Sequence, residues 1–167
     1  NNKIRLLFLG EIGKRKGIYD LLQAISNERD YFAQHIELHI GGNLEEEKLQ
    51  AFIRHHNLSD FVTFMGWVSG NKKTECLEWA HIYILPSYNE GLPIGILEAM
   101  SYRMPIISTP VGGIPEVVEP YQNGILVQPG NHKEISSALH YFIDNPDLIS
   151  QYGEASYTKA QPYFPES

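Results

Sequence analysis

Two carboxylates, Glu90 and Glu98, stand eight positions apart in residues 86–100, which read Pro-Ser-Tyr-Asn-Glu-Gly-Leu-Pro-Ile-Gly-Ile-Leu-Glu-Ala-Met. This stretch links a short apolar segment, residues 82–85, to a predicted helix over residues 93–102. Pro93 suits the first turn of that helix, where its missing N–H would have no partner anyway. Carboxylates at such a junction are suited to accept hydrogen bonds from a polar ligand.

The backbone just ahead of this helix is a second candidate for binding. The amides of Gly91 and Leu92 would face outward at the positive end of the helix dipole and offer an anion site. Glu98 falls among apolar residues, and charges are rarely buried without a partner. Two interpretations are open: both carboxylates bind a ligand, or Glu98 is an ordinary surface residue of a strand–loop–helix unit.

The loop of residues 10–17 carries three consecutive cations, Lys14, Arg15 and Lys16, between glycines. Just before a helix, these cations would suit a diphosphate through their charges and the free amides of the helix terminus. A solvated basic turn explains the same residues. The loop has neither the Walker pattern nor the G-x-G-x-x-G fingerprint, which disfavours an NAD-dependent enzyme.

Apolar runs alternate with helical patterns along the chain, as in a parallel sheet with helices on its faces. The predicted strands are apolar runs bounded by turn residues: residues 4–9, 36–40, 61–64, 82–85, 106–108 and 124–127. The predicted helices lie near residues 18–25, 44–56, 71–80, 93–102, 133–143 and 146–159, with a short helical turn through residue 118. We therefore expect a single domain, residues 1–167, with an α/β fold: a Rossmann-like, doubly wound, parallel six-stranded sheet.

The loops that follow these strands should meet at one place. They comprise residues 10–17, 41–43, 66–70, 86–91 and 109–113. Because the carboxyl ends of parallel strands share one edge of the sheet, and ligands bind in the crevice beyond it, the sequence predicts a binding site there.

Composition narrows the class of protein. With 167 residues the chain has the length of about one domain, and its net charge of −7 argues against a general nucleic-acid binder. The sequence has no membrane-spanning run and no signal-peptide pattern, and its single cysteine, Cys76, fits a reducing compartment, so we expect a cytoplasmic protein. The seven histidines lack metal-ligand spacing, so we expect no metal site; His39 and His81 are interpreted as packing residues.

Residues 86–100 resemble the E-x7-E motif of retaining GT-B glycosyltransferases of family GT4, including the flanking Pro-Ser, Glu-Gly and Glu-Ala-Met. Lys16-Gly17 matches the Lys-Gly with which that family opens its first helix. The resemblance covers residues 4–164 and implies the C-terminal, donor-binding half of a two-domain GT-B enzyme. It also implies that the N-terminal, acceptor-binding half is absent from this chain and is its natural partner.

The reaction implied by this resemblance is transfer of a sugar from a nucleotide-diphosphate donor with retention of the anomeric configuration. Glu90 and Lys16 are the implied catalytic residues: Glu90 contacts the donor sugar, and Lys16 stabilises the leaving diphosphate. Glu98 is implied to accept hydrogen bonds from the ribose. No cofactor or metal is implied, since protein cations take the metal's place. The groups implied to assist at the diphosphate are Lys14 or Arg15 and the amides of Gly91 and Leu92.

The same resemblance places several turns around the nucleotide. The residues implied to line it are Gly10, Gly42, Gly66, Trp67 and Val68. A tight turn that needs a positive φ angle explains the glycines equally well. For Trp67 we favour a half-buried packing role over contact with the nucleobase.

One position departs from the family pattern. Where the family usually has an arginine after the first strand, this sequence has Glu11, which reverses the charge beside the expected diphosphate. Three explanations are open: Lys14 or Arg15 supplies the missing charge, Glu11 turns away and pairs with one of them, or donor binding is weak or lost.

The expected function is therefore that of a glycosyltransferase donor domain, which binds a nucleotide-diphosphate sugar for polysaccharide, lipopolysaccharide or glycolipid synthesis. We expect no nucleic-acid partner, and peripheral contact with the inner face of a membrane only through the absent half. The alternatives are a non-catalytic nucleotide-sugar sensor, for which Glu11 is the best support, and a GT-B-like sugar-nucleotide epimerase.

Overall fold

The computed structural model describes residues 2–165, so the ends of the expected domain, residue 1 and residues 166–167, lie outside the described residues. Six parallel strands form one sheet in the order β3-β2-β1-β4-β5-β6. They are β1 (Ile4–Leu9), β2 (Ile36–Gly41), β3 (Val62–Gly66), β4 (Ile82–Ile84), β5 (Ile106–Ser108) and β6 (Gly124–Leu126). This confirms the predicted doubly wound, Rossmann-like sheet, whose strand order reverses between β1 and β4.

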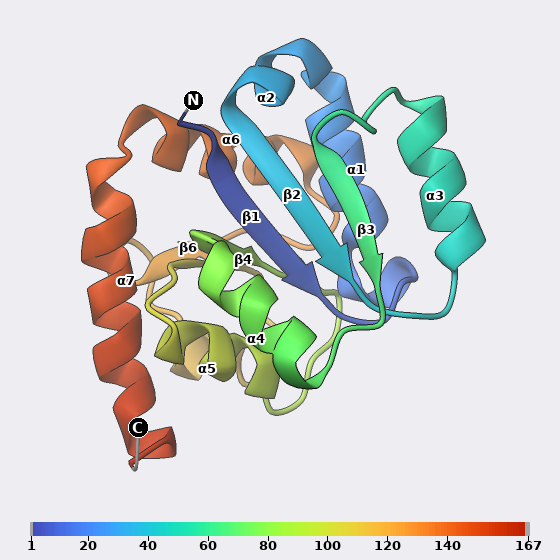
Figure 1. The fold of residues 1–167 in the computed structure, drawn as a ribbon. Coiled ribbons are helices and arrows are strands. Elements are labelled where there is room, and N and C mark those ends of the chain that lie inside the picture. The colour runs from blue at the N-terminus through green and yellow to red at the C-terminus, as the bar shows by residue number, and fades with distance from the viewer. Residues whose placement is uncertain (1, 166–167) are drawn as a thin grey trace.

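Helices cover both faces of the sheet (Figure 1). They are α1 (Ile18–Asn27), α2 (Arg29–His35), α3 (Glu46–His55), α4 (Gly70–Trp79), α5 (Ile94–Ser101), α6 (His132–Asp144) and α7 (Asp147–Ala160). On one face α1 packs against α6, and on the other α5 packs against α7. Short 3-10 turns occupy Lys14–Lys16, Ile114–Glu116 and Gln161–Tyr163.

The central strand shows why the sequence pattern was readable. Leu6, Leu7 and Phe8 of β1 are all fully buried, because helices lie over both faces and neither side of the strand meets water. In α1 the apolar positions at helical spacing, among them Ile18 and Leu22, are fully buried against the sheet.

Besides small shifts at other element ends, the structure differs from the prediction at three places. The helix α2 was missed, because Phe32 is its one fully buried residue and leaves no apolar period to detect. The helix α3 begins at Glu46 and not at residue 44, because Leu44 has a φ of 83° and pairs with Ile12 of the first loop. Pro93 is the N-cap of α5 and lies just outside its first turn.

His39 is a packing residue, as predicted, whereas His81 is fixed by a hydrogen bond to the backbone. The ring of His39 stacks on Trp79 with 3.6 Å between centroids. The Nδ1 of His81 accepts a hydrogen bond of 2.9 Å from the backbone N–H of Arg5. Burial lowers the pKa of both imidazoles, and the Arg5 charge lowers that of His81 further.

These two histidines make stability depend on pH. A histidine whose pKa is lowered by folding binds fewer protons in the native state than in the unfolded chain, so its contribution is complete above about pH 6.5 and is lost as the pH falls. We expect the free energy of unfolding to decrease from pH 7.5 to pH 5.5, by at most about 1.4 kcal/mol per pH unit for each histidine. Urea unfolding at several pH values measures this slope.

Substitutions test whether His81 causes part of this pH dependence of stability. In His81→Asn the amide oxygen can replace Nδ1 as acceptor for Arg5 while removing the titrating ring, so the slope should decrease. His55→Asn, at an exposed position of α3, should keep the original slope. A slope unchanged in His81→Asn would contradict the assignment.

Candidate functional site

The loops after the strands converge on one edge of the sheet, as predicted. The N–H of Gly10 donates to Gly41 O at 3.0 Å, and the N–H of Gly42 donates to Gly66 O at 2.9 Å. On the other side of the strand-order reversal, the N–H of Tyr88 donates to Arg15 O at 2.8 Å. Backbone hydrogen bonds therefore fix the loops relative to each other.

Two glycines let neighbouring loops approach the loop after β4 closely. Gly17 has a φ of 82°, and a Cβ there would lie 2.0 Å from Pro86 O. Gly112 has a φ of 55°, and a Cβ there would lie 1.8 Å from Glu90 O. A side chain at either position would be strained in its backbone and would also collide with this loop.

The close packing at Gly17 brings the two predicted catalytic residues together. Lys16 Nζ donates to Glu90 Oε2 at 2.7 Å, and the hydroxyl of Ser87 donates to the same oxygen at 2.6 Å. The side chains of Lys16 and Glu90 are only 16% and 8% exposed. The pair is therefore a shielded, charge-assisted contact, and two hydrogen bonds fix the position of the Glu90 carboxylate.

Glu98 also has a cationic partner, which the sequence analysis missed. Lys73 Nζ, from the first turn of α4, lies 2.7 Å from Glu98 Oε1 in α5, and both side chains are about one-third exposed. The sequence did contain one indication of this role. Lys73 lies in the first turn of α4, directly after the third strand-end loop, and a cation there is unfavourable because it meets the positive end of the helix dipole. Glu98 is thus neither buried alone nor an isolated surface residue.

A cavity of about 220 Å³ opens at the reversal of strand order. Besides Lys73, the predicted residues that line it are Gly10, Glu11, Gly42, Trp67, Val68 and Glu98. Tyr83 lines it too; its hydroxyl donates to Leu9 O at 3.2 Å, and burial, with the nearby Glu90 and Glu98, raises its pKa. The phenol therefore stays protonated and acts as a fixed polar group of the wall.

The favoured interpretation of Trp67 is wrong. Its side chain is 64% exposed, whereas Val68 beside it is buried. The glycine before it explains the difference: Gly66 has a φ of 74° and ends β3, so the chain turns outward at Trp67. The indole therefore lies at the mouth of the cavity and offers an aromatic face to a ligand.

The other predicted phosphate residues lie outside this cavity. Arg15 Nη2 pairs with Glu11 Oε1 at 3.4 Å, both being more than half exposed, and Lys14 Nζ lies 5.9 Å from the centre of the Tyr88 ring. Of the three explanations for Glu11, the geometry matches pairing with a neighbouring cation, although Glu11 still lines the cavity.

The loop that leads into α5 keeps its amides available. Within residues 2–165, no group accepts a hydrogen bond from the N–H of Gly91 or Leu92. The carbonyl of Gly91 accepts from the N–H of Gly113 at 3.0 Å, which fixes the loop, and the Leu92 side chain is 72% exposed. These two donors can therefore meet an anion outside the helix.

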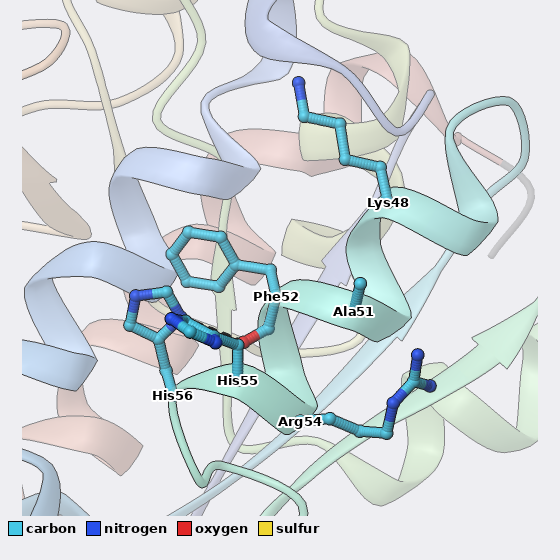
Figure 2. A pocket seen from close by; sticks show the side chains of 6 residues that line it. All are labelled: Lys48, Ala51, Phe52, Arg54, His55 and His56. Carbon is cyan, nitrogen blue, oxygen red and sulfur yellow. Dashed lines mark hydrogen bonds between the residues drawn. The ribbon is translucent and has the colours of Figure 1, made fainter.

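A wider pocket, of about 650 Å³, lies along α3. Figure 2 shows the residues that line it: Lys48, Ala51, Phe52, Arg54, His55 and His56. None of the predicted site residues lines it. The ring of Phe52 stacks on that of His56 with 3.9 Å between centroids, so these two lining residues already pack against each other. Position relative to the strand ends, and not size, selects the smaller cavity as the candidate site.

The sequence model described as glycosyl transferases group 1 matches residues 1–159. The chain belongs to this family. An uncharacterized glycosyltransferase of Haemophilus influenzae is 32% identical over 125 residues, which are 74% of this chain and 35% of that protein. The chain thus spans about a third of the length of that relative.

Solved structures agree on the fold. The C-terminal domain of LpcC, a glycosyl transferase group 1 family protein from Francisella tularensis, has a TM-score of 0.84 at 20% identity, over 98% of this chain and 87% of that chain. Anabaena HepE, solved in complex with UDP and glucose, has a TM-score of 0.83 at 20% identity, over 98% of this chain and 45% of that chain. The neighbours are GT-B glycosyltransferases, so the predicted half of a GT-B fold is confirmed.

Residues 2–165 contain neither a metal-ligand cluster nor a membrane-spanning helix. Across that range no three His, Cys, Asp or Glu side chains group as metal ligands would, and the absence of a metal from the reaction stays a prediction. No helix in the same range combines the length and apolar character needed to span a bilayer.

The Lys16–Glu90 pair should contribute strongly to stability. Lys16→Met leaves the shielded carboxylate of Glu90 with Ser87 alone, and we expect a loss of about 3 kcal/mol in the free energy of unfolding. Denaturant unfolding measures the loss. The double variant Lys16→Met/Glu90→Gln, which removes the uncompensated charge, should recover part of it.

The exposed pair in the same loop provides the control. Arg15→Met breaks the Arg15–Glu11 contact at the surface and should cost less than about 1 kcal/mol. Equal losses for Lys16→Met and Arg15→Met would show that the Glu90 pair is not the constraint described.

Proposed function

We propose that this domain binds the nucleotide-diphosphate sugar of a retaining glycosyltransferase. The observation that carries the proposal is the cavity at the reversal of strand order, with a carboxylate, Glu98, paired to Lys73 inside it. Doubly wound sheets bind nucleotides at that place. The family match supports transfer of a glycosyl group, and the solved complex of Anabaena HepE with UDP and glucose supports a nucleotide and a sugar as ligands.

The nucleoside end of the donor would lie in the cavity. Glu98 would accept hydrogen bonds from the ribose hydroxyls, since a carboxylate offers acceptors only. Lys73, which holds Glu98 from the side, would act as a positioning residue. Trp67 and Val68 would contact the base, with the indole as an aromatic surface.

The diphosphate would lie between the first loop and the start of α5. Lys16 has three N–H donors, so it can keep its contact with Glu90 and still donate to a phosphate oxygen. The free amides of Gly91 and Leu92 would add donors where negative charge develops on the leaving diphosphate. Glu90, fixed by Lys16 and Ser87, would contact the donor sugar.

Transfer to an acceptor would need the remainder of a two-domain enzyme, as in relatives about twice as long. An acceptor in polysaccharide, lipopolysaccharide or glycolipid synthesis, a cytoplasmic location and peripheral membrane contact through that other half belong to this proposal. So does a domain that extends over the full 167 residues.

A nucleotide-sugar sensor is the second candidate, and Glu11 favours it. A carboxylate that lines the cavity near the expected diphosphate repels that charge, and its contact with Arg15 is too exposed to cancel the effect completely. Weak phosphate binding would suit a protein that detects the nucleotide sugar without transferring the sugar.

The role of Glu98 is tested with UDP. Glu98→Ala should weaken UDP binding by roughly tenfold to hundredfold, because hydrogen bonds from the ribose to a charged acceptor are lost. Calorimetric titration measures the dissociation constant. The matched control is Glu47→Ala, at an exposed position of α3, which should leave the affinity unchanged. Equal affinities in Glu98→Ala and the original protein would refute the ribose assignment.

The role of Glu11 is tested by reversing its charge. Glu11→Arg should tighten UDP binding by roughly tenfold, because a repulsive charge near the diphosphate becomes an attractive one. The same titration at low and high salt should show the gain shrinking with screening. An unchanged or weaker affinity would place Glu11 away from the phosphates and remove the main support for the sensor.

A further inference from the structure

A second pocket, of about 510 Å³, lies at the edge of the sheet opposite to the candidate donor site. It is lined by the start of β1, by His81 just before β4, by Arg103 after α5, and by the first turn of α7. These segments precede the strands or lie at their amino ends, whereas the donor cavity follows the carboxyl ends. In Figure 1 the start of β1 lies near the connection from α6 to α7. A ligand there would not meet the donor.

The lining of this pocket is cationic. Lys3, Arg5 and Arg103 line it, and no aspartate or glutamate does. The whole chain carries 20 acidic and 13 basic residues, with a net charge of −7. Three basic side chains around one concave surface of an acidic protein create a local positive potential that is focused by the low-dielectric walls.

The two guanidinium groups are held in place by their inner nitrogens. Arg5 Nε donates to Trp79 O at 2.5 Å, and the guanidinium lies 5.6 Å from the centre of the Trp79 ring. Arg103 Nε donates to Glu154 at 2.9 Å, and its guanidinium lies 3.7 Å from the centre of the Tyr157 ring. In the described part of the chain, residues 2–165, no group accepts from the terminal Nη atoms of either arginine.

His81 adds a neutral donor. Its Nδ1 accepts from the Arg5 N–H, so the proton of the neutral ring is on Nε2. Ser150, in the first turn of α7, also lines the pocket and carries a hydroxyl. Glu154 neutralises part of the charge of Arg103 but leaves its outer nitrogens free. The pocket therefore offers side-chain N–H and O–H donors from four segments of the chain.

We propose that this pocket binds a phosphate group carried by a larger molecule, at a site separate from the donor cavity. Phosphate suits it because preorganised guanidiniums donate to two oxygens at once, and a tetrahedral anion can meet donors from several directions. A volume of about 510 Å³ falls in the range of small-molecule sites and leaves room beyond one phosphate group. The source is either a soluble phosphorylated metabolite or a phospholipid headgroup.

The first experiment titrates this chain with pyrophosphate and follows the amide signals by NMR. The backbone signals of His81, Arg103 and Ser150 should shift together and saturate. The amide signals of Gly10 and Gly42 report on the donor cavity, so pyrophosphate binding there is distinguished from binding at this pocket. No saturable shift around His81 would overturn the proposal and would leave the proposed function untouched.

Variants decide which side chains are responsible. Arg103→Gln should weaken pyrophosphate binding at this pocket by roughly tenfold and leave UDP binding unchanged. Lys3→Gln should also weaken pyrophosphate binding at this pocket. Because Lys3 forms no ion pair within residues 2–165, this variant tests the site even if Arg103→Gln destabilises the fold. The matched control is Arg54→Gln, an exposed arginine of α3. Equal effects of Arg54→Gln and Arg103→Gln would reduce the result to net charge and overturn the site.

A second experiment distinguishes a soluble phosphorylated metabolite from a phospholipid headgroup. Vesicles of phosphatidylcholine with and without phosphatidylglycerol are sedimented with the protein, with and without pyrophosphate as competitor. Sedimentation that needs phosphatidylglycerol, is displaced by pyrophosphate and is lost in Arg103→Gln assigns a lipid headgroup. Saturable pyrophosphate binding without sedimentation assigns a soluble phosphorylated ligand.

Discussion

The candidate donor site depends on how closely three loops can pack. The loop after β4 passes between Gly17 on one side and Gly112 on the other, and at both points a Cβ would collide with a backbone oxygen. This contact brings Lys16 against Glu90 and shields the pair from water. The amides of Gly91 and Leu92 stay outside it and remain free to bind. One backbone constraint thus separates the groups that hold the site together from the groups that can meet a ligand.

The fold was readable from sequence because β1, β4 and β5 are largely buried on both faces. The apolar run Leu6–Leu9 of β1 and the glycine-containing loops after the strands were enough to predict the parallel sheet and the edge that carries the site. What escaped prediction depends on contacts between distant segments. Leu44 adopts a positive φ where it pairs with Ile12, and that pairing delays α3. The α2 helix has too little buried surface to leave a pattern.

The residues of the candidate site were likewise predicted only in part. Residues fixed by a local motif, such as Glu90, Glu98 and Lys16, lie where the strand ends placed them. Lys73 was missed because its meeting with Glu98 depends on how α4 lies beside α5 after the chain crosses the sheet. The exposure of Trp67 follows from one backbone angle at Gly66, which the residue types alone do not specify. Residues within a local motif could be predicted from the sequence, whereas the partners that tertiary packing brings to them could not.

The reversal of strand order also has a mechanical meaning. Six residue pairs join β1 to β2, whereas only two, Leu6 with Ile82 and Leu7 with Tyr83, join β1 to β4. Two pairs also join β4 to β5, so the ladder becomes short at the reversal and stays short beyond it. The candidate cavity straddles the reversal, with Gly42 after β2 on one side and Glu98 on the helix that follows β4 on the other. A molecule bound there would touch elements on both sides of the short β1–β4 joint and so link strands that few backbone pairs connect.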